Sequence, residues 1–169
     1  MEKIEIITLQ PNDWLQYKEL RLKALKEEPQ AFVSTYEENL KHPDEFWQKR
    51  LEEALIGQSQ CLLFAKVKNN LVGMVGGFVG DGKDNAEVIA VFVIKEFRGQ
   101  GISKILMNEL IKTMKHNNVI RRLLVGVNPE QAAALNLYIS LGFKIIKKEK
   151  MILGDGKEHD SYEMEMLLE

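Results

Sequence analysis

Arg98-Gly99-Gln100-Gly101-Ile102-Ser103 is the stretch that decides the fold prediction, because it joins a predicted strand to a predicted helix. At such a junction the first N–H groups of the helix have no helical partner and point outward, which makes an anion site. Glycine at positions 99 and 101 removes the Cβ atoms that would keep phosphate oxygens away, and Arg98 adds a permanent charge with forked donors. The stretch predicts a loop that binds a diphosphate, with an unliganded strand-to-helix turn as the alternative.

Two common phosphate-binding motifs fit this loop poorly. A dinucleotide fingerprint needs a third glycine three residues after the second, and that position is Lys104. A P-loop needs Gly-Lys-Ser or Gly-Lys-Thr at the end of a longer loop, which does not occur here. The loop is therefore expected to bind a diphosphate without forming either of these two motifs.

The segments on either side of the loop predict a mixed α/β protein. A strand is predicted at 86–94, and after Gly101 the apolar residues recur at helical spacing to about His116. Further strands are predicted at 3–8, 61–67, 71–79, 121–127, 143–148 and 162–168, and further helices at 14–28, 43–55 and 131–140. Residues 30–41 show no period and are predicted to form a loop over the sheet, and turns are predicted at 69–70, 81–85 and 154–156.

Length and composition predict one domain over residues 1–169. Apolar residues make up 45% of the chain and charged residues 28%, which is typical of a globular protein with its own core. A net charge of −2 gives no broad field for nucleic acid or anionic lipid, so neither is expected as a partner. Cys61 is the only cysteine, which excludes an intrachain disulfide and a cysteine zinc cluster, and no metal is expected. Residues 1–9 lack a continuous apolar segment, so we expect a cytoplasmic protein.

Three motifs resemble the GNAT family of N-acetyltransferases. Arg98, Gly101 and Ser103 are similar to the family's Arg/Gln-x-x-Gly-x-Gly/Ala loop, with serine in place of the last small residue. The segment 135–143, Leu-Asn-Leu-Tyr-Ile-Ser-Leu-Gly-Phe, looks like the family's Leu-Tyr-x-x-x-Gly-Phe. A third set resembles the Arg-x-x-Ala-Leu-x-x-x-Pro-x-Ala-Phe of some bacterial members: Leu20, Arg21, Ala24, Leu25, Pro29, Ala31 and Phe32.

The resemblance implies a fold and a cosubstrate, acetyl-CoA. The implied fold is a mostly antiparallel mixed sheet of six to seven strands flanked by about four helices, with two central strands parallel and splayed. The pantetheine arm would then pair with backbone groups of 90–94 and 121–127, and an amide near Phe92 or Val93 would polarise the thioester carbonyl. Where the family usually has Asn, this chain has Gln131, with Asn128 three residues earlier. The implied binding residues are Phe92, Val93, Ile94, Arg98, Gly99, Gln100, Gly101, Ile102, Ser103, Lys104, Gln131 and Tyr138.

Two side chains are candidates for proton transfer. An alkylamine has a pKa of roughly 10.4 and must lose a proton before it attacks, so a base is needed. Glu87 resembles a Glu that many members use directly or through water, although a solvated or ion-paired carboxylate is the alternative. Tyr138 matches the family's acid, which protonates the departing thiolate, and a purely structural tyrosine is the alternative. Weaker candidates for the base are Glu37, Glu38, His159 and Asp160.

The resulting prediction is an acyl-CoA-dependent N-acyltransferase that moves acetyl to a primary amine by direct attack in a ternary complex. The sequence does not identify the amine, which could be a small molecule, a peptide or a protein lysine. A non-catalytic acyl-CoA sensor is the first alternative, and a nucleotide-binding or purely structural α/β protein is the second. The resemblance also implies a homodimer.

Overall fold

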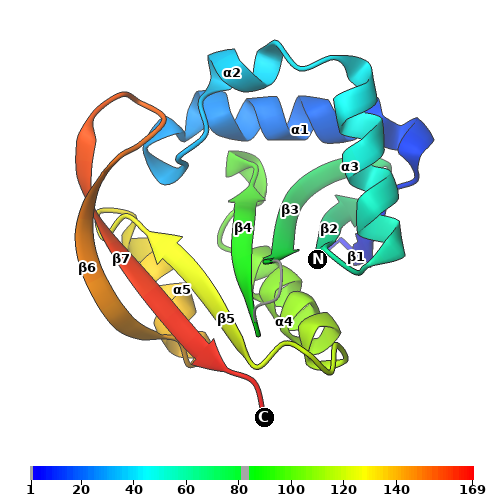
Figure 1. Cartoon of the computed structure of the whole chain (residues 1–169). Coiled ribbons are helices and arrows are strands. Elements are labelled where there is room, and N and C mark those ends of the chain that lie inside the picture. The colour runs from blue at the N-terminus through cyan, green and yellow to red at the C-terminus, as the bar shows by residue number, and fades with distance from the viewer. Residues whose placement is uncertain (1, 81–83) are drawn as a thin grey trace.

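The computed structural model describes residues 2–80 and 84–169. Within these ranges, seven strands form one sheet in the order β1-β2-β3-β4-β5-β7-β6, and the chain has five α-helices, of which α2 packs on α1 (Figure 1). The strands are β1 Ile4–Ile7, β2 Gln60–Val67, β3 Asn70–Val79, β4 Asn85–Val93, β5 Arg122–Val127, β6 Lys144–Ile152 and β7 Glu158–Leu167. The helices are α1 Trp14–Glu27, α2 Tyr36–Leu40, α3 Asp44–Ile56, α4 Ile102–Lys115 and α5 Ala132–Leu141, with short 3-10 turns at Pro11–Asp13, Pro29–Ala31 and Lys95–Phe97. The predicted fold class is confirmed.

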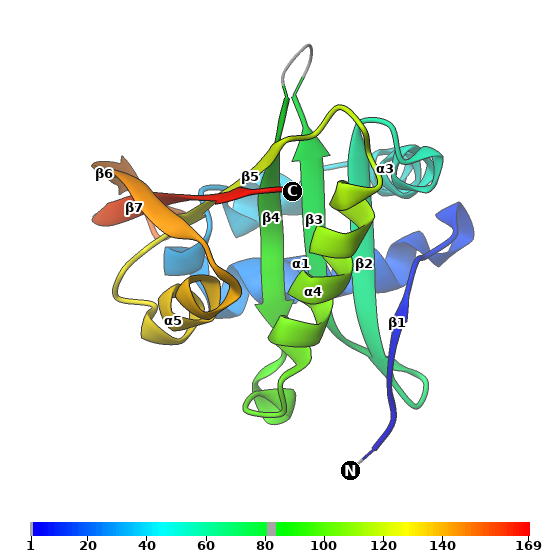
Figure 2. The same ribbon diagram turned by 90° about the horizontal axis from the view of Figure 1, so that it is seen from below.

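The helices cover both faces of the sheet. Figure 2 shows α4 and α5 on one face, with α1 crossing behind the strands on the other. The apolar stripe predicted on α4 is buried except for Ile105, which is exposed, and Leu106, Leu110 and Met114 pack on the first face. On the other face the Tyr17 ring meets the rings of Trp47 and Phe64 edge-on, at centroid distances of 5.3 and 5.6 Å. Two apolar clusters thus hold the central strands between the helical layers.

The parallel pair β4–β5 separates part of the way along its length. Pairing runs from Asn85 opposite Arg122 to Val88 opposite Val125 and stops there. Beyond Val88, strand β4 stays paired with β3, but its register shifts between Met74 and Gly76. Ala90, within this irregularity, has a φ of 57°, which is uncommon for a residue with a side chain. A bulge of this kind bends a strand and redirects its backbone groups, so it accompanies the splay that the resemblance implied.

Three segments differ from the sequence prediction or extend it. The loop predicted at 30–41 contains α2, whose start is a capping box: Thr35 Oγ1 accepts from Glu38 N at 3.1 Å, and Glu38 Oε2 accepts from Thr35 N at 3.4 Å. Strands β6 and β7 are longer than predicted, because they pair up to Ile152 opposite Glu158 on both sides of the turn. The turn predicted at 81–85 falls largely on 81–83, outside the described residues.

Candidate acyl-CoA site

A cleft of about 670 Å³ opens where β4 and β5 diverge. Its walls come from β4, the loop before α4, the first half of α5, the β6–β7 hairpin and the segment that follows α1. Most of the predicted site residues line it together: Glu87, Phe92, Val93, Arg98, Gly99, Gly101, Ile102, Ser103, Lys104, Gln131 and Tyr138. Ile94 and Gln100, which were also predicted, lie outside the lining.

The loop before α4 is open toward the cleft. Gly99 and Gly101 have φ values of 76° and 79°, and a Cβ atom added at either would meet no atom within 4 Å. The first helical bond is donated by Ile105 to the Gly101 carbonyl at 3.0 Å, so the amides of residues 102–104 have no acceptor within the helix. No side chain caps this end of α4. The bend therefore presents free amides at the positive end of a 14-residue helix.

Arg98 lines the cleft, and its guanidinium group also contacts two protein groups. Its Nε donates to the Val93 carbonyl at 2.9 Å, and its Nη2 lies 2.9 Å from Glu28 Oε1. The guanidinium group thus braces the loop against the end of β4 and the residue after α1. The amides of residues 102–104 are thus the donors at this bend that have no acceptor within the helix.

The end of β4 directs one particular amide into the gap. Ile94 N donates to the Val72 carbonyl at 2.9 Å, on the β3 side. Because successive amides of a strand point to opposite sides, the amide of Val93 points away from β3 and toward the gap left by β5. By the same alternation the amide of Phe92 belongs to the β3 side. Of the predicted amides near 92–94, Val93 is therefore the one placed to meet a thioester oxygen.

Tyr138 lines the cleft from α5 and is only 4% exposed. Its ring meets Phe143 at a centroid distance of 5.9 Å, and the Phe143 amide donates to the Tyr138 carbonyl at 3.0 Å. The chain reverses at Gly142, whose φ is 102°. Burial raises the pKa of Tyr138, so its hydroxyl keeps its proton at neutral pH. A protonated hydroxyl in this place can act as a proton donor.

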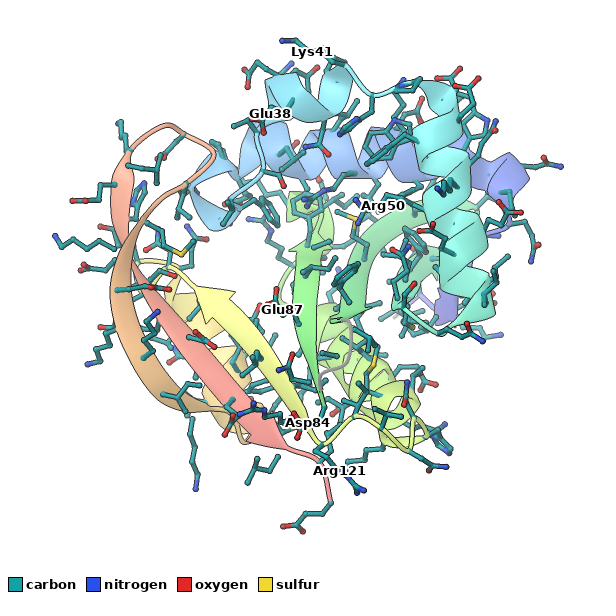
Figure 3. All side chains as sticks on the ribbon, in the orientation of Figure 1. Glu38, Lys41, Arg50, Asp84, Glu87 and Arg121 are labelled. Atoms are coloured by element: carbon teal, nitrogen blue, oxygen red, sulfur yellow. The ribbon has the colours of Figure 1, made fainter. Side chains whose placement is uncertain are left out.

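Two further predicted residues lie on opposite walls. Glu87 is exposed on β4, where its backbone is paired with Leu124 just before the strands diverge, and Figure 3 shows it beside the gap. Gln131 is the residue that precedes α5 and lines the cleft. Asn128 also lines the cleft, but its amide is used structurally, because Nδ2 donates to the Gln30 carbonyl at 3.2 Å and Oδ1 accepts from Glu130 N at 3.0 Å.

The four weaker candidates for the base lie outside the cleft lining. Glu38 caps α2 and Glu37 is exposed on the same helix. His159 Nε2 lies 2.7 Å from Asp155 Oδ2, an interaction that closes the β6–β7 turn, while Asp160 is exposed. Glu87 is thus the predicted base that the fold places in the cleft.

The sequence prediction missed one wall of the cleft. Glu149, Met151, Ser161 and Glu163 form it from the β6–β7 hairpin. No local pattern marks these residues, because β7 reaches the cleft only by pairing with β5, Tyr162 lying opposite Val127.

The other side of the cleft is formed by α1 and the segment that follows it, which contribute Arg21, Phe32 and Ser34 to the lining. The hairpin turn touches this segment, since Gly154 N donates to the Phe32 carbonyl at 2.7 Å.

Among the described residues there is no cluster of three or more His, Cys, Asp or Glu that could hold a metal ion. None of the helices in the described ranges has the length and apolar character needed to cross a bilayer.

An open helix start lies beside two parted parallel strands, an arrangement that suits a long ligand with a phosphate end. Residues 17–143 match the model of the acetyltransferase (GNAT) family, and the chain belongs to that family. The fold resembles that of a GNAT-family acetyltransferase from Streptococcus pneumoniae, with a TM-score of 0.87 and 21% identity over 99% of this chain and 100% of that one. A Salmonella typhimurium structure, described with its cofactor acetyl-CoA, has a TM-score of 0.82 and 17% identity over 99% and 95% of the two chains.

The chain is similar in sequence to curated relatives over about half of its length. The N-acetylaspartate synthetase of Rattus norvegicus is 32% identical over 85 residues, which are 50% of this chain and 28% of that protein. The match therefore spans little more than a quarter of the relative's length.

Proposed function

We propose that this chain is an acyl-CoA-dependent N-acyltransferase that moves acetyl from acetyl-CoA to a primary amine by direct attack in a ternary complex. The observation that carries the proposal is that a single cleft is lined by the open start of α4, by Val93 and by Tyr138. Membership of the acetyltransferase family and the acetyl-CoA of the Salmonella structure support the choice of donor. The catalytic domain is proposed to span residues 1–169.

The cleft fits acetyl-CoA at both ends. The amides of the loop and first turn at 99–104 would bind the pyrophosphate. The pantetheine arm would lie along the part of β4 beyond Val88, which β5 leaves unpaired. Its thioester oxygen would then meet the Val93 amide. A preorganised donor to a developing oxyanion typically lowers the barrier by about 2.7–4 kcal/mol, so this amide would be a major catalytic group.

The proposed reaction is an acyl transfer in which the amine nitrogen forms a bond to the acetyl carbon and the carbon–sulfur bond then breaks. Glu87, directly or through water, takes the proton that the nitrogen loses. Tyr138 gives its proton to the departing thiolate, whose intrinsic pKa is about 8.5, and regains one from solvent. Burial raises the pKa of Tyr138, which keeps the hydroxyl protonated but also makes it a weaker acid, so the support for this role is the position of Tyr138 in the cleft lining.

Calorimetry with CoA and a thiol-release assay with acetyl-CoA and a panel of amines test the proposal. Amine-dependent release of thiol, with an N-acetylated product seen by mass spectrometry, would support an acyltransferase. CoA binding without turnover on any amine would favour a sensor instead. Binding of ATP or NAD in place of CoA would overturn both.

A further inference from the structure

Two arginines from different helices meet around one tyrosine at the α1 end of the cleft. Arg21 on α1 and Arg50 on α3 are the charged groups whose fields reach the hydroxyl of Tyr17. Within the described residues, neither arginine forms a salt bridge to a carboxylate. Arg21 Nη1 and Arg50 Nε are both buried and have no hydrogen-bond partner there. Figure 3 shows Arg50 reaching from α3 into the space beside α1 and above β4.

The neighbouring polar groups do not balance these charges. Burial raises the pKa of Tyr17 in spite of both guanidinium groups, so its hydroxyl stays neutral and is not a counter-ion. Glu28 is the nearby carboxylate of the cleft lining, and it is occupied by Arg98 Nη2 at 2.9 Å and by Gln30 Nε2 at 2.9 Å. Burial lowers the pKa of Arg21, and the positive charge of Arg50 lowers it further, so a charged Arg21 without a counter-ion is costly here.

The two guanidinium groups are held by aromatic faces. Arg21 lies over the Phe32 ring with its Cζ 5.0 Å from the centroid, and Arg50 lies over Phe46 at 5.5 Å. Stacking fixes the plane of a guanidinium group and leaves its N–H edge available for a planar anion. Arg21 lines the same cleft as Val93 and Tyr138, whereas Arg50 lies behind it. The pair therefore gives the acceptor end of the cleft a preorganised, positively charged edge.

The opposite wall has the other sign of charge. Glu87 on β4 and Glu163 on β7 both line the cleft. A ligand with a cationic amine and an anionic group would match the two walls at once. A polyamine would bring its charges to Arg21, where they would be repelled.

We propose that the acceptor amine carries a carboxylate and that Arg21 binds this carboxylate, with Arg50 adding positive potential from behind. The acceptors are then amino acids, or peptides with an accessible carboxylate, and not polyamines or plain alkylamines. This inference rests on the proposed acetyl transfer and narrows its substrate class. It also gives a function to Arg21, which the sequence motif contains but the reaction does not use.

The first experiment compares matched amines in the thiol-release assay. Amino acids with two to six carbons and short peptides are each paired with the corresponding primary amide, and aminoalkyl phosphonates of the same length test a tetrahedral anion. We expect KM for the best acid to be about 10- to 100-fold lower than for its amide, as for a hydrogen-bonded charged group. A phosphonate that outperforms every carboxylate, or amides that equal the acids, would overturn the proposal.

The second experiment removes the guanidinium group. Arg21→Gln should raise KM for the acid about 10- to 100-fold and leave that for the amide within about threefold. Arg21→Lys keeps the charge and the buried aliphatic stem but loses the planar guanidinium group. Its KM for the acid should therefore lie between that of the wild type and that of Arg21→Gln. The control is Arg122→Gln. Arg122 lies on β5 outside the cleft lining, and its Nη1 is 3.1 Å from Glu165 Oε2. Equal KM changes for acid and amide in both Arg21 variants would rule out carboxylate binding.

A binding measurement separates this inference from the proposed reaction. N-acetylated acids and their amides are titrated calorimetrically into the protein saturated with CoA. Tighter binding of the acid, lost in Arg21→Gln and retained in Arg122→Gln, would support the carboxylate site even if no amine were acetylated. Turnover with no preference for acids in either assay would sink this inference and leave the acyltransferase intact.

Discussion

Arg98 and Glu28 form an ion pair, with 2.9 Å between Nη2 and Oε1, that joins the loop before α4 to the residue after α1. The same arginine donates from Nε to the Val93 carbonyl at 2.9 Å. One side chain thus links the loop before α4, the end of β4 and the residue that follows α1. The ion pair is partly exposed, at 43% for the arginine and 20% for the glutamate, which limits its own contribution.

Glu28→Gln should therefore cost less than about 1 kcal/mol of unfolding free energy. Arg98→Gln also loses the bond to Val93 and should cost about 1–2 kcal/mol more, because that bond comes from a charged donor. Urea unfolding measures both values. Equal losses in the two variants would mean that the contact with Val93 contributes nothing.

The openness of the bend can be tested at Gly101. Gly101→Ala should weaken CoA binding at least about tenfold, because the new methyl group enters the space where the pyrophosphate would lie. The positive φ also strains alanine by about 1–2 kcal/mol. Gly57→Ala is a matched control, since Gly57 has a φ of 71°, has open space around its Cβ position and ends α3 far from the cleft. Equal stability losses with CoA binding reduced in Gly101→Ala alone would locate the anion site at the bend; unchanged affinity would remove it.

Tyr138→Phe should lower kcat about 10²- to 10⁴-fold, the usual range for a lost general acid. CoA affinity should change less than about threefold, because the ring and its packing on Phe143 remain. Steady-state kinetics and calorimetry give the two numbers. A variant with normal turnover would show that the hydroxyl takes no part in the reaction.

The raised pKa of Tyr138 also predicts a dependence of stability on pH. Above the ordinary tyrosine pKa of 10.0 the unfolded chain loses this proton while the folded protein keeps it, so the stability that burial of the neutral hydroxyl provides is lost as pH rises. The unfolding free energy should fall by about 1.4 kcal/mol per pH unit for this group. Chemical unfolding of wild type and Tyr138→Phe from pH 8 upward measures the effect as the difference between their slopes. Parallel curves would contradict a raised pKa.

Glu87→Gln should lower kcat/KM at neutral pH about 10²-fold or more if Glu87 accepts the amine proton. The deficit should shrink as pH rises toward the pKa of the amine, because more of the acceptor is then neutral without help. A pH–rate profile of both proteins provides the comparison. A deficit that stays constant with pH would point to a binding role for the carboxylate.

Gly154→Ala should open the acceptor end of the cleft. A Cβ atom at this position would lie 2.7 Å from the Ser34 carbonyl oxygen and 2.8 Å from that of Pro29, and backbone oxygens cannot move aside cheaply. We expect a loss of about 1–3 kcal/mol in unfolding free energy and a higher KM for the amine. CoA binding, which depends on the far end of the cleft, should be retained. Normal KM for the amine would show that contact between the hairpin turn and this segment does not shape the acceptor site.

The elements with strong local signals could be predicted from the sequence. The amphipathic stripe of α4, the glycines that open it, and Tyr138 followed by Gly142 and Phe143 each show a pattern within a few residues of the chain. The short helix α2 was missed although its capping box is also local, since Thr35 and Glu38 are three residues apart. Its five residues are too few to establish a helical period.

The sequence alone thus determined the family and the fold and located the open loop before α4, because short-range patterns dictate helix starts, strands and tight turns. The tertiary structure decided which amide of β4 points into the gap and which carboxylate pairs with Arg98. It also decided that Arg21 and Arg50 both lie near Tyr17. These relationships join residues far apart in the chain. They depend on which strands pair and how the helices pack, and local sequence patterns predict neither.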